Sequence, residues 1–353
     1  MFYAGFLWGA ILVDLMWVVC RLMLFVAVIV FGACFFTAKV KAFSVNIVLM
    51  SFQHRIIFGN SQHMSELESG SVQLMVTSPP YPMIAMWDDQ FCSSDPKIAE
   101  YWQKLNFDGN EKTVRQIYDA MHHNLAKVWA ETFRVLCNGG IAAINIGDAT
   151  RRINDRFQLF PNHSRIIEEC EKIGFSTLPY ILWKKPTTKP AYKGKGSFLG
   201  SGFLPPNAYV TLDCEFILLF RKGTLRHFKT KDPARYESKF TKEQRDEWFS
   251  QIWSLKGARQ NVNDLERRTA AYPAEVAERL IHMFSIKDDL VLDPFLGSGT
   301  TTKVAIESGR RSIGYELDPK LLPIIQARLE ETQIALQTDI MSQIKIVTRY
   351  GEC

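Results

Sequence analysis

Short apolar runs alternate with amphipathic segments along most of the chain. The apolar runs are typical of buried strands and lie at 72–77, 141–146, 177–183, 215–221, 290–293 and 311–316. Segments with apolar residues at helical spacing lie at 113–136, 161–173, 274–284, 300–308 and 319–331. We expect Asn138-Gly139-Gly140 to end the first helix, Gly174 to end the second, and Pro273 to be the first residue of the third. This alternation predicts an α/β fold with a mixed, mostly parallel sheet and helices on both faces.

The composition is that of a folded, globular protein. Hydrophobic residues make up 47% and charged residues 22% of the 353 positions, which excludes a disordered or fibrous chain. At roughly 150 residues per domain, the length corresponds to about two domains. The 7 cysteines form no Cys-x-x-Cys pair and fit no zinc ligand set, so we expect reduced thiols, a cytoplasmic location and no metal. The adjacent His122 and His123 fall in a predicted helix, where solvated or partly buried positions are commoner than metal sites.

Residues 1–49 differ from the rest of the chain. Positions 1–38 are almost entirely apolar, with only Asp14 and Arg21 charged, and Lys39 and Lys41 follow. Because about 20 apolar residues can cross a bilayer, one interpretation is a membrane helix. In a second interpretation Met50 opens an ordinary α/β domain, and the preceding residues come from a wrongly assigned start. A buried hydrophobic hairpin is the third interpretation.

A basic segment separates the two halves of the remaining chain. Residues 184–245 contain 14 Lys and Arg against 5 Asp and Glu, a net charge of +9 compared with +5 for the whole chain. The segment begins with many Gly and Pro residues and includes aromatic residues such as Tyr192 and Phe198. This combination favours a nucleic-acid surface over an ordinary solvated surface. The expected DNA contacts are Lys184, Lys185, Lys189, Lys193 and Lys195.

The first chemical motif joins a predicted strand to a predicted helix. It runs Asp293-Pro294-Phe295-Leu296-Gly297-Ser298-Gly299, and the helix follows from Thr300. Glycines at such a turn let the backbone approach a ligand, and the helix N-terminus directs free N–H groups toward it. Glu316 ends the next strand, where a carboxylate can accept hydrogen bonds from both ribose hydroxyls. Together these features predict a site for a nucleoside-type cofactor.

The second chemical motif is Thr77-Ser78-Pro79-Pro80-Tyr81 at the end of an apolar strand. Two consecutive prolines fix the backbone and remove N–H donors, which leaves carbonyl acceptors at the carboxyl edge of the sheet. A hydroxyl, free carbonyls and an aromatic ring suit a planar base that carries an amino group. A proline strand terminator is the simpler interpretation of an isolated Pro-Pro pair, but the first motif makes it less favourable.

The pairing of these two motifs resembles the amino-group DNA methyltransferases, and their order along the chain resembles the circularly permuted group called β. Gly59-Asn60-Ser61 resembles the group's Gly-Asp-Ser/Cys element, with Asn60 in place of the acid. Further matches are 137–148, 181–186, 215–223 and 271–281, so that the resemblance covers about residues 55–335. It implies a Rossmann-like class I fold that depends on S-adenosyl-L-methionine, with a loop-rich target-recognition insertion.

The resemblance also implies roles for individual residues. Ser78, Pro79, Pro80 and Tyr81 would be catalytic, acting on a base flipped out of the duplex. The residues implied to bind the cofactor are Asn60, Ser61, Thr77, Pro273, Asp293, Pro294, Phe295, Gly297, Ser298, Gly299, Thr300, Glu316 and Leu317. Ordinary core packing is an equal alternative for Phe295, and a helix cap is favoured for Asp318. Serine before Pro-Pro is associated in this family with methylation of cytosine at N4, whereas Asp or Asn is associated with adenine N6.

The implied organisation has five parts. They are the extension 1–49, a catalytic half 50–183, a basic target-recognition region 184–260 interrupted by the core strand 215–221, a cofactor-binding half 261–340 and a tail 341–353. The implied partners are double-stranded DNA and a cognate restriction endonuclease, with the enzyme a monomer or homodimer.

Three alternatives remain open from the sequence. They are an adenine-N6 methyltransferase of the same group, a non-catalytic nucleic-acid-binding protein on a decayed fold, and a membrane-anchored enzyme that modifies RNA or a protein amide. The intact motifs argue against decay, and the serine before Pro-Pro argues against a protein amide.

Overall fold

The computed structural model describes residues 53–153, 156–185, 210, 212–257 and 272–349. The chain divides after Gln53, and the following account concerns the unit His54–Cys353. The apolar stretch 1–38, expected as a membrane helix or as upstream sequence, lies outside the described residues. Among the helices that are described, none is long and apolar enough to cross a bilayer.

A nine-stranded sheet forms the centre of this unit, in the order β11-β1-β10-β9-β2-β3-β7-β6-β8. Every neighbouring pair is parallel except that β7 runs antiparallel to both β3 and β6. The strands are β1 (His54–Phe58), β2 (Val72–Thr77), β3 (Leu136–Ile146), β6 (Ser176–Lys184), β7 (Cys214–Arg221), β8 (Ile252–Ser254), β9 (Leu290–Asp293), β10 (Arg311–Glu316) and β11 (Ile344–Thr348). The expected mixed, mostly parallel sheet is therefore confirmed.

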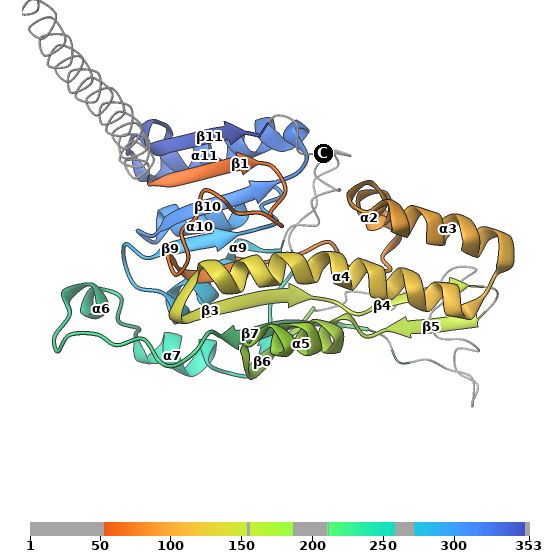
Figure 1. Ribbon diagram of the computed structural model, residues 1–353. Coiled ribbons are helices and arrows are strands. Elements are labelled where there is room, and N and C mark those ends of the chain that lie inside the picture. The colour runs from red at the N-terminus through yellow and green to blue at the C-terminus, as the bar shows by residue number, and fades with distance from the viewer. Residues whose placement is uncertain (1–52, 154–155, 186–209, 211, 258–271, 350–353) are drawn as a thin grey trace, which may run out of the picture. The chain divides into compact units, whose positions relative to one another are not determined.

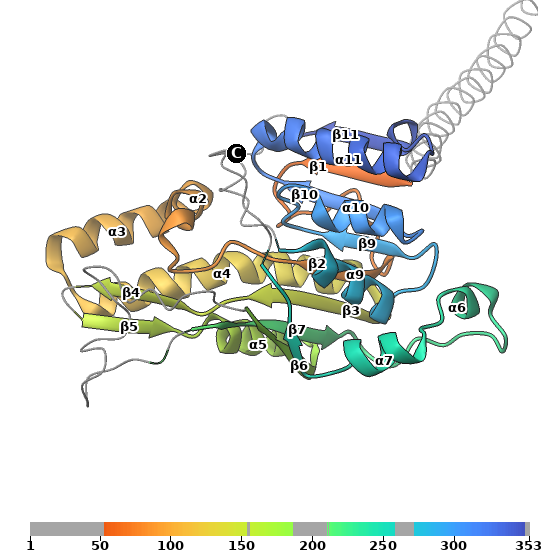
Figure 2. The same cartoon turned by 180° about the vertical axis from the view of Figure 1, so that it is seen from behind.

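Helices cover both faces of the sheet (Figure 1, Figure 2). On one face lie α4 (Glu111–Val135) and α5 (Asn162–Ile173), and on the other α9 (Ala274–Phe284), α10 (Thr300–Glu307) and α11 (Leu322–Leu336). Separate apolar clusters fill the two interfaces, with Trp129 of α4 in one and Trp183 and Trp253 in the other. Burial of these faces from water is the main favourable contribution to folding.

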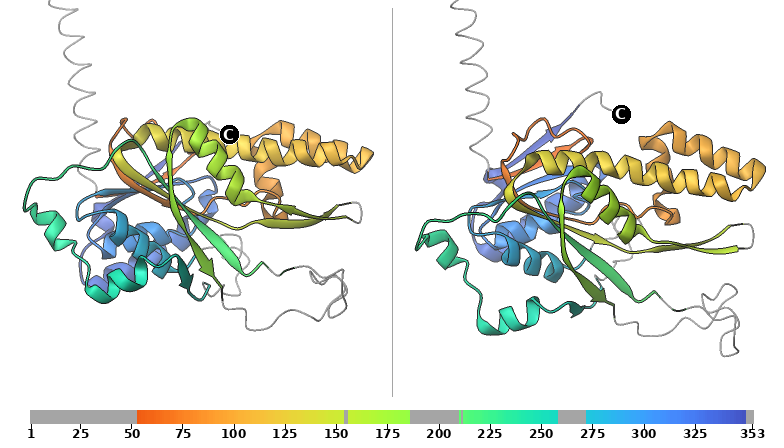
Figure 3. Two further views of the ribbon diagram at one scale, coloured as in Figure 1. Left: turned by 90° about the horizontal axis from the view of Figure 1, so that it is seen from below. Right: turned by 60° about the horizontal axis from the view of Figure 1, so that its bottom comes forward.

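Smaller elements complete the unit. The helices are η1 (Ala85–Trp87), α2 (Asp88–Ser94), α3 (Pro96–Asp108), α6 (Pro233–Glu237), α7 (Lys242–Trp248), η2 (Pro319–Leu321) and η3 (Met341–Gln343). A separate antiparallel hairpin consists of β4 (Ala149–Ile153) and β5 (Arg156–Phe160). Figure 3 shows α3 and this hairpin extending from the same end of the sheet.

The predicted boundaries hold for most elements, but two glycine and proline signals were misassigned. Helix α4 ends at Val135, and Asn138-Gly139-Gly140 belongs to the beginning of β3. The β2–β3 register shifts there, and Gly139, with φ of 79°, donates its N–H to the Lys222 carbonyl at 2.7 Å. These residues therefore form an irregular strand start instead of a helix stop. Pro273 has extended backbone and precedes α9 as its N-cap, so it is not the first helical residue.

Candidate active site at the carboxyl edge of the sheet

Both predicted motifs lie at the same edge of the sheet. Strands β1, β10, β9, β2 and β3 are successive parallel neighbours, so their carboxyl ends are side by side. The Gly59-Asn60-Ser61 element follows β1, Ser78 follows β2, and the glycine turn follows β9. Ligands of open α/β sheets bind at this edge.

Asp293 joins β9 to its neighbours. Its side chain is buried, and Oδ1 accepts hydrogen bonds from Thr77 Oγ1 at 2.6 Å and from the Phe295 N–H at 3.1 Å. Thr301 donates to the other carboxylate oxygen and also contacts the Tyr272 hydroxyl. Burial raises the pKa of Asp293 to about 6, although these hydrogen bonds favour the ionised form. The hydrogen bond between Thr77 and Asp293 thus connects the ends of β2 and β9 beneath the site.

The turn after Asp293 has the backbone that its glycines permit. Gly297 and Gly299 have φ of 54° and 83°, which L side chains rarely adopt. Gly314 of β10 lets the turn approach closely, because a Cβ there would lie 2.6 Å from the Leu296 side chain. Helix α10 begins without a side-chain cap, and the buried Ser298 hydroxyl has no hydrogen-bond partner within the described part of the chain. The turn therefore offers unused donors to a ligand, while the Thr300 hydroxyl is bonded to Arg328.

Glu316 lies beside this turn at the end of β10. Its Oε2 accepts a hydrogen bond from the Gly297 N–H at 2.8 Å, and Oε1 accepts from the N–H groups of Leu317 and Asp318 at 2.9 Å each. Burial raises the pKa of the Glu316 carboxyl to about 7, against the effect of these three donors. Because a carboxylate has about four acceptor positions, it can still accept from a ligand hydroxyl. Asp318 caps η2 through the Lys320 N–H, which confirms the expected cap.

The element after β1 is hydrogen-bonded to Glu316 and to Arg349, the residue that follows β11. The Gly59 N–H donates to the Glu316 carbonyl at 2.8 Å, and the Asn60 side chain accepts from the Gln62 N–H at 2.9 Å. Ser61 is buried. Arg349, which the sequence reasoning did not single out, pairs with Glu66 and donates to the Asn60 carbonyl at 3.1 Å. Its pairing with Glu66 spans 283 positions, so no local pattern could have indicated it.

The Ser-Pro-Pro-Tyr segment is held rigidly. Pro79 and Pro80 are buried, whereas Ser78 and Tyr81 are partly exposed. The Tyr81 carbonyl accepts from the Ile84 N–H at 3.1 Å, and the Pro82 carbonyl accepts from the Asn162 side chain at 3.1 Å. The buried Met83 has φ of 64°, an uncommon backbone for a residue other than glycine. Such strained positions cluster at functional sites.

Four donor–acceptor contacts surround the Tyr81 hydroxyl and its neighbours. Ser78 Oγ lies 3.3 Å from the phenol oxygen, and Asn145 Nδ2 donates to that oxygen at 2.9 Å. The phenol donates to Glu215 Oε2 at 3.0 Å, and Asn145 also donates to Glu215 Oε2 at 2.8 Å. Burial, and then the Glu215 charge, raise the pKa of Tyr81 well above its usual value. Asn145 and Glu215 are functional candidates that the motif analysis missed.

The remaining predicted cofactor residues lie around the same edge. Phe295 packs edge-on against Trp129 with ring centroids 5.9 Å apart, which supports a packing role, and Pro294 is buried beside it. Leu317 is 43% exposed. Pro273 is connected to the glycine turn indirectly, because the neighbouring Tyr272 contacts Thr301 at the beginning of α10.

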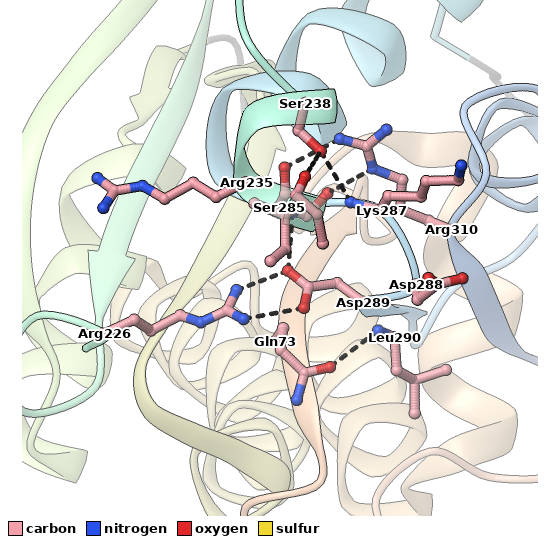
Figure 4. A network of polar contacts seen from close by, with 12 residues as sticks. Gln73, Arg226, Arg235, Ser238, Ser285, Lys287, Asp288, Asp289, Leu290 and Arg310 are labelled. Carbon is pink, nitrogen blue, oxygen red and sulfur yellow. Dashed lines mark hydrogen bonds and ion pairs between the residues drawn. The ribbon is translucent and has the colours of Figure 1, made fainter. Parts of the chain in front are cut away.

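The described residues of the basic segment are divided between two edges of the sheet, whereas the sequence pattern predicts a nucleic-acid surface for residues 184–245 as a whole. Lys184 and Lys185 lie at the carboxyl edge, and Lys189, Lys193 and Lys195 lie outside the described residues. Beyond β7 the chain continues at the opposite edge: Arg226 pairs with Asp289, which immediately precedes β9, at 2.6 and 2.9 Å (Figure 4). Figure 4 also shows Ser238 bonded to the Lys287 N–H there, at 2.9 Å.

Several cations of this second part have structural partners. Lys222 Nζ donates to the carbonyls of Phe133 at 2.5 Å and Leu136 at 2.7 Å, near the end of α4. Part of the positive charge of residues 222–245 is therefore used in contacts within the protein and does not face the candidate site.

Histidine and cysteine positions give no metal site in the described part of the chain. No group of three or more His, Cys, Asp or Glu side chains there could hold an ion. His122 is a core residue bonded to Asn162 at 3.1 Å, and burial lowers its pKa to about 3. Cys92, Cys137, Cys170 and Cys214 are free thiols.

Known proteins match this chain over most of its length. A family model described as DNA methylase, of the N6/N4 type, matches residues 72–327. The Type II methyltransferase M.MjaI of Methanocaldococcus jannaschii is 59% identical over 280 residues, which are 78% of this chain and 91% of that protein. The Type II methyltransferase M.MthZI of Methanothermobacter thermautotrophicus is 49% identical over 288 residues, 80% of this chain and 78% of that protein.

Solved structures agree with the architecture. TTHA0409 of Thermus thermophilus, described as a putative DNA modification methylase and solved with S-adenosyl-L-methionine, has a TM-score of 0.61 and 29% identity, and the match covers 83% of this chain and 99% of that one. The cytosine-N4-specific PvuII DNA methyltransferase has a TM-score of 0.52 and covers 84% of this chain and 97% of that one. At 16% identity the PvuII enzyme supports the fold alone. By its family match and its two long relatives, this chain belongs to the N6/N4 DNA methylase family.

Proposed function

We propose that this protein transfers a methyl group from S-adenosyl-L-methionine to the exocyclic N4 amine of cytosine in double-stranded DNA. The observation that carries the proposal is the joint position of Ser78-Pro79-Pro80-Tyr81 and the glycine turn at one edge of the sheet, linked by the Thr77–Asp293 hydrogen bond of 2.6 Å. Serine before Pro-Pro favours cytosine N4 over the alternative, adenine N6. The Type II names of the two close relatives support a place in a restriction–modification pair.

The residues at the glycine turn fit a nucleoside cofactor with a charged tail. The buried Ser298 hydroxyl and the uncapped start of α10 would supply hydrogen-bond donors to it. Glu316 would accept hydrogen bonds from the ribose hydroxyls, and Gly297 and Gly299 would allow the backbone to approach. When bound, S-adenosyl-L-methionine supplies an electrophilic methyl group on a sulfonium.

The catalytic segment would act on a base that has left the duplex stack. Tyr81 would stack on the base, while the Ser78 hydroxyl and the Pro79 carbonyl would accept hydrogen bonds from its amine. These contacts orient the nitrogen lone pair toward the methyl group, a contribution of position and electrostatics that requires no covalent enzyme intermediate. The amine nitrogen would form its new bond to the methyl carbon as the bond from that carbon to the sulfonium sulfur breaks, which leaves S-adenosyl-L-homocysteine as the by-product, and the nitrogen would then lose a proton to solvent.

DNA would lie along the carboxyl edge of the sheet. Lys184 ends β6 there with an exposed side chain, and the chain continues directly into residues 186–209. We propose that Lys184 and the lysines of that segment contact phosphates, which carry most of the salt-dependent affinity.

Transfer of labelled methyl groups to competing polymers tests the substrate class. We expect label in unmethylated duplex DNA, with little in RNA or protein, and we expect Ser78→Ala to lower the rate by at least about tenfold through loss of an orienting contact. Label in RNA or protein but not in DNA would contradict the proposal.

A further inference from the structure

Lys185 occupies a different environment from its neighbour Lys184. Its ammonium group pairs with Glu215 Oε1 and lies 4.7 Å from the centre of the Trp183 ring. Its backbone N–H donates to the Asp213 carbonyl at 2.8 Å, which fixes it against the strand that carries Glu215. Lys184 is exposed. The Lys185 side chain, although 39% exposed, therefore has partners within the protein, whereas the sequence pattern predicts DNA contacts for both lysines.

Glu215 connects Lys185 to the catalytic segment. Its side chain is only 14% exposed, and its two carboxylate oxygens contact different residues. Oε1 pairs with Lys185, whereas Oε2 accepts from the Tyr81 phenol at 3.0 Å and from Asn145 at 2.8 Å. A carboxylate so little exposed needs a compensating charge, because an uncompensated one is costly to bury.

The Tyr81 side chain is held by its hydroxyl, and one edge of its ring lies close to Gly147. Glu215 and Asn145 hold the hydroxyl, and a Cβ added at Gly147 would lie 3.0 Å from the ring carbon Cε2. The same Cβ would lie 3.3 Å from Glu215 Cγ. Gly147 thus permits Tyr81 and Glu215 to pack together against the end of β3.

We propose that Lys185 and Glu215 are positioning residues that hold Tyr81 in the orientation required to stack on the target base, and that Lys185 is not a phosphate ligand. The inference rests on the proposed function in one respect: it takes Tyr81 as the stacking residue. It applies equally to cytosine or adenine, since either base presents a flat face. Pre-organisation of this kind raises the turnover rate and leaves DNA affinity largely unchanged.

Three matched substitutions test this assignment: Lys185→Met, Lys184→Met and Lys229→Met. Each removes one positive charge from a lysine, and Lys229 is an exposed lysine in the segment at the opposite edge. DNA dissociation constants at several salt concentrations, and kcat and KM for DNA, would be measured for each full-length variant.

We expect Lys185→Met to lower kcat by about tenfold, the equivalent of one charge-assisted hydrogen bond. For this variant, the slope of log DNA affinity against log salt concentration, here called the salt slope, should equal that of the unsubstituted protein. Lys184→Met should raise KM for DNA and reduce the salt slope by about one unit, and Lys229→Met should change neither. An unchanged kcat with a reduced salt slope for Lys185→Met would overturn the inference.

A double-substitution cycle separates positioning from general loss of structure. Because Tyr81→Phe lacks the hydroxyl that Glu215 holds, Lys185→Met and Glu215→Gln should lower kcat much less in that background than in the unsubstituted protein. Lys185→Arg, which keeps a charge-assisted pair with Glu215, should keep kcat within about twofold of the unsubstituted protein. If Lys185→Met or Glu215→Gln lowered kcat by the same factor in Tyr81→Phe as in the unsubstituted protein, this result would contradict the inference. The DNA-binding measurements need no methyl transfer, so they test Lys185 even if the protein proves not to methylate DNA.

Discussion

Glu316 has two properties that bear on cofactor binding. Three backbone N–H groups hold its carboxylate in place, and burial raises its pKa to about 7. This buried carboxyl is therefore about half protonated near neutral pH, and a ligand that needs the ionised form must compete with a proton. The glutamate at the strand end was identified from its spacing to the glycine turn, but its raised pKa follows from burial that the sequence does not reveal.

This property predicts a pH dependence for nucleoside binding. Below pH 7 the dissociation constant should rise by up to about tenfold for each unit by which the pH falls, because protonation of Glu316 competes with its contacts to the ligand hydroxyls. Above about pH 8 the dissociation constant should be independent of pH. 5′-Methylthioadenosine is the suitable probe, since it lacks the cofactor's α-amino group, which titrates near pH 8.

Glu316→Gln is the matched control, because glutamine cannot ionise. It should bind the probe more weakly at pH 8 and show little change between pH 6 and 8. An unchanged pH profile in Glu316→Gln would assign the titration to another group, such as Asp293, whose pKa is about 6.

Strands β2 and β9 depend on side chains as well as on backbone pairing. Their register covers only Leu74 with Val291 and Met75 with Leu292, and the Thr77–Asp293 contact extends it to the functional edge. Thr77→Val should lower the free energy of unfolding by about 2 kcal/mol at pH 8, since a hydrogen bond to a buried charge is worth about 1.5–3 kcal/mol.

The penalty of Thr77→Val should depend on pH in a defined direction. The lost hydrogen bond favours ionised Asp293, so the penalty is present above about pH 6 and shrinks as pH falls through the pKa of Asp293. Thr132→Val is the control, because the buried Thr132 hydroxyl has no hydrogen-bond partner within the described residues. Urea unfolding of both variants checks this, and equal penalties at pH 8 would contradict it.

Strongly apolar strands were predictable, whereas contacts between distant strands were not. The boundaries of β9 and β10 match the sequence pattern because their residues are buried on both faces. Glu215 and Tyr81 are 134 positions apart, and the pairing of β2 with β3 and of β3 with β7 brings them together. Helices α2 and α3 and the β4–β5 hairpin were missed because they combine many polar residues with short apolar stretches.

The fold brings two motifs that are far apart in the sequence to the same edge of the sheet. The Ser-Pro-Pro-Tyr segment comes first along the chain and the glycine turn last, yet β2 and β9 are adjacent in the sheet. The division of the basic segment between two edges could not be predicted, since charge counts carry no topology. Arg226 and Lys222 stabilise the edge opposite the site through Asp289 and backbone carbonyls.

The identity of the methylated nucleoside tests the central claim most directly. Unmethylated genomic DNA would be treated with the protein and S-adenosyl-L-methionine, digested, and its nucleosides analysed by mass spectrometry, with Ser78→Ala in parallel. The account predicts N4-methylcytosine from the unsubstituted protein and its loss, by at least about tenfold, in Ser78→Ala. N6-methyladenine in place of N4-methylcytosine would contradict the assignment of Ser78 to a cytosine amine.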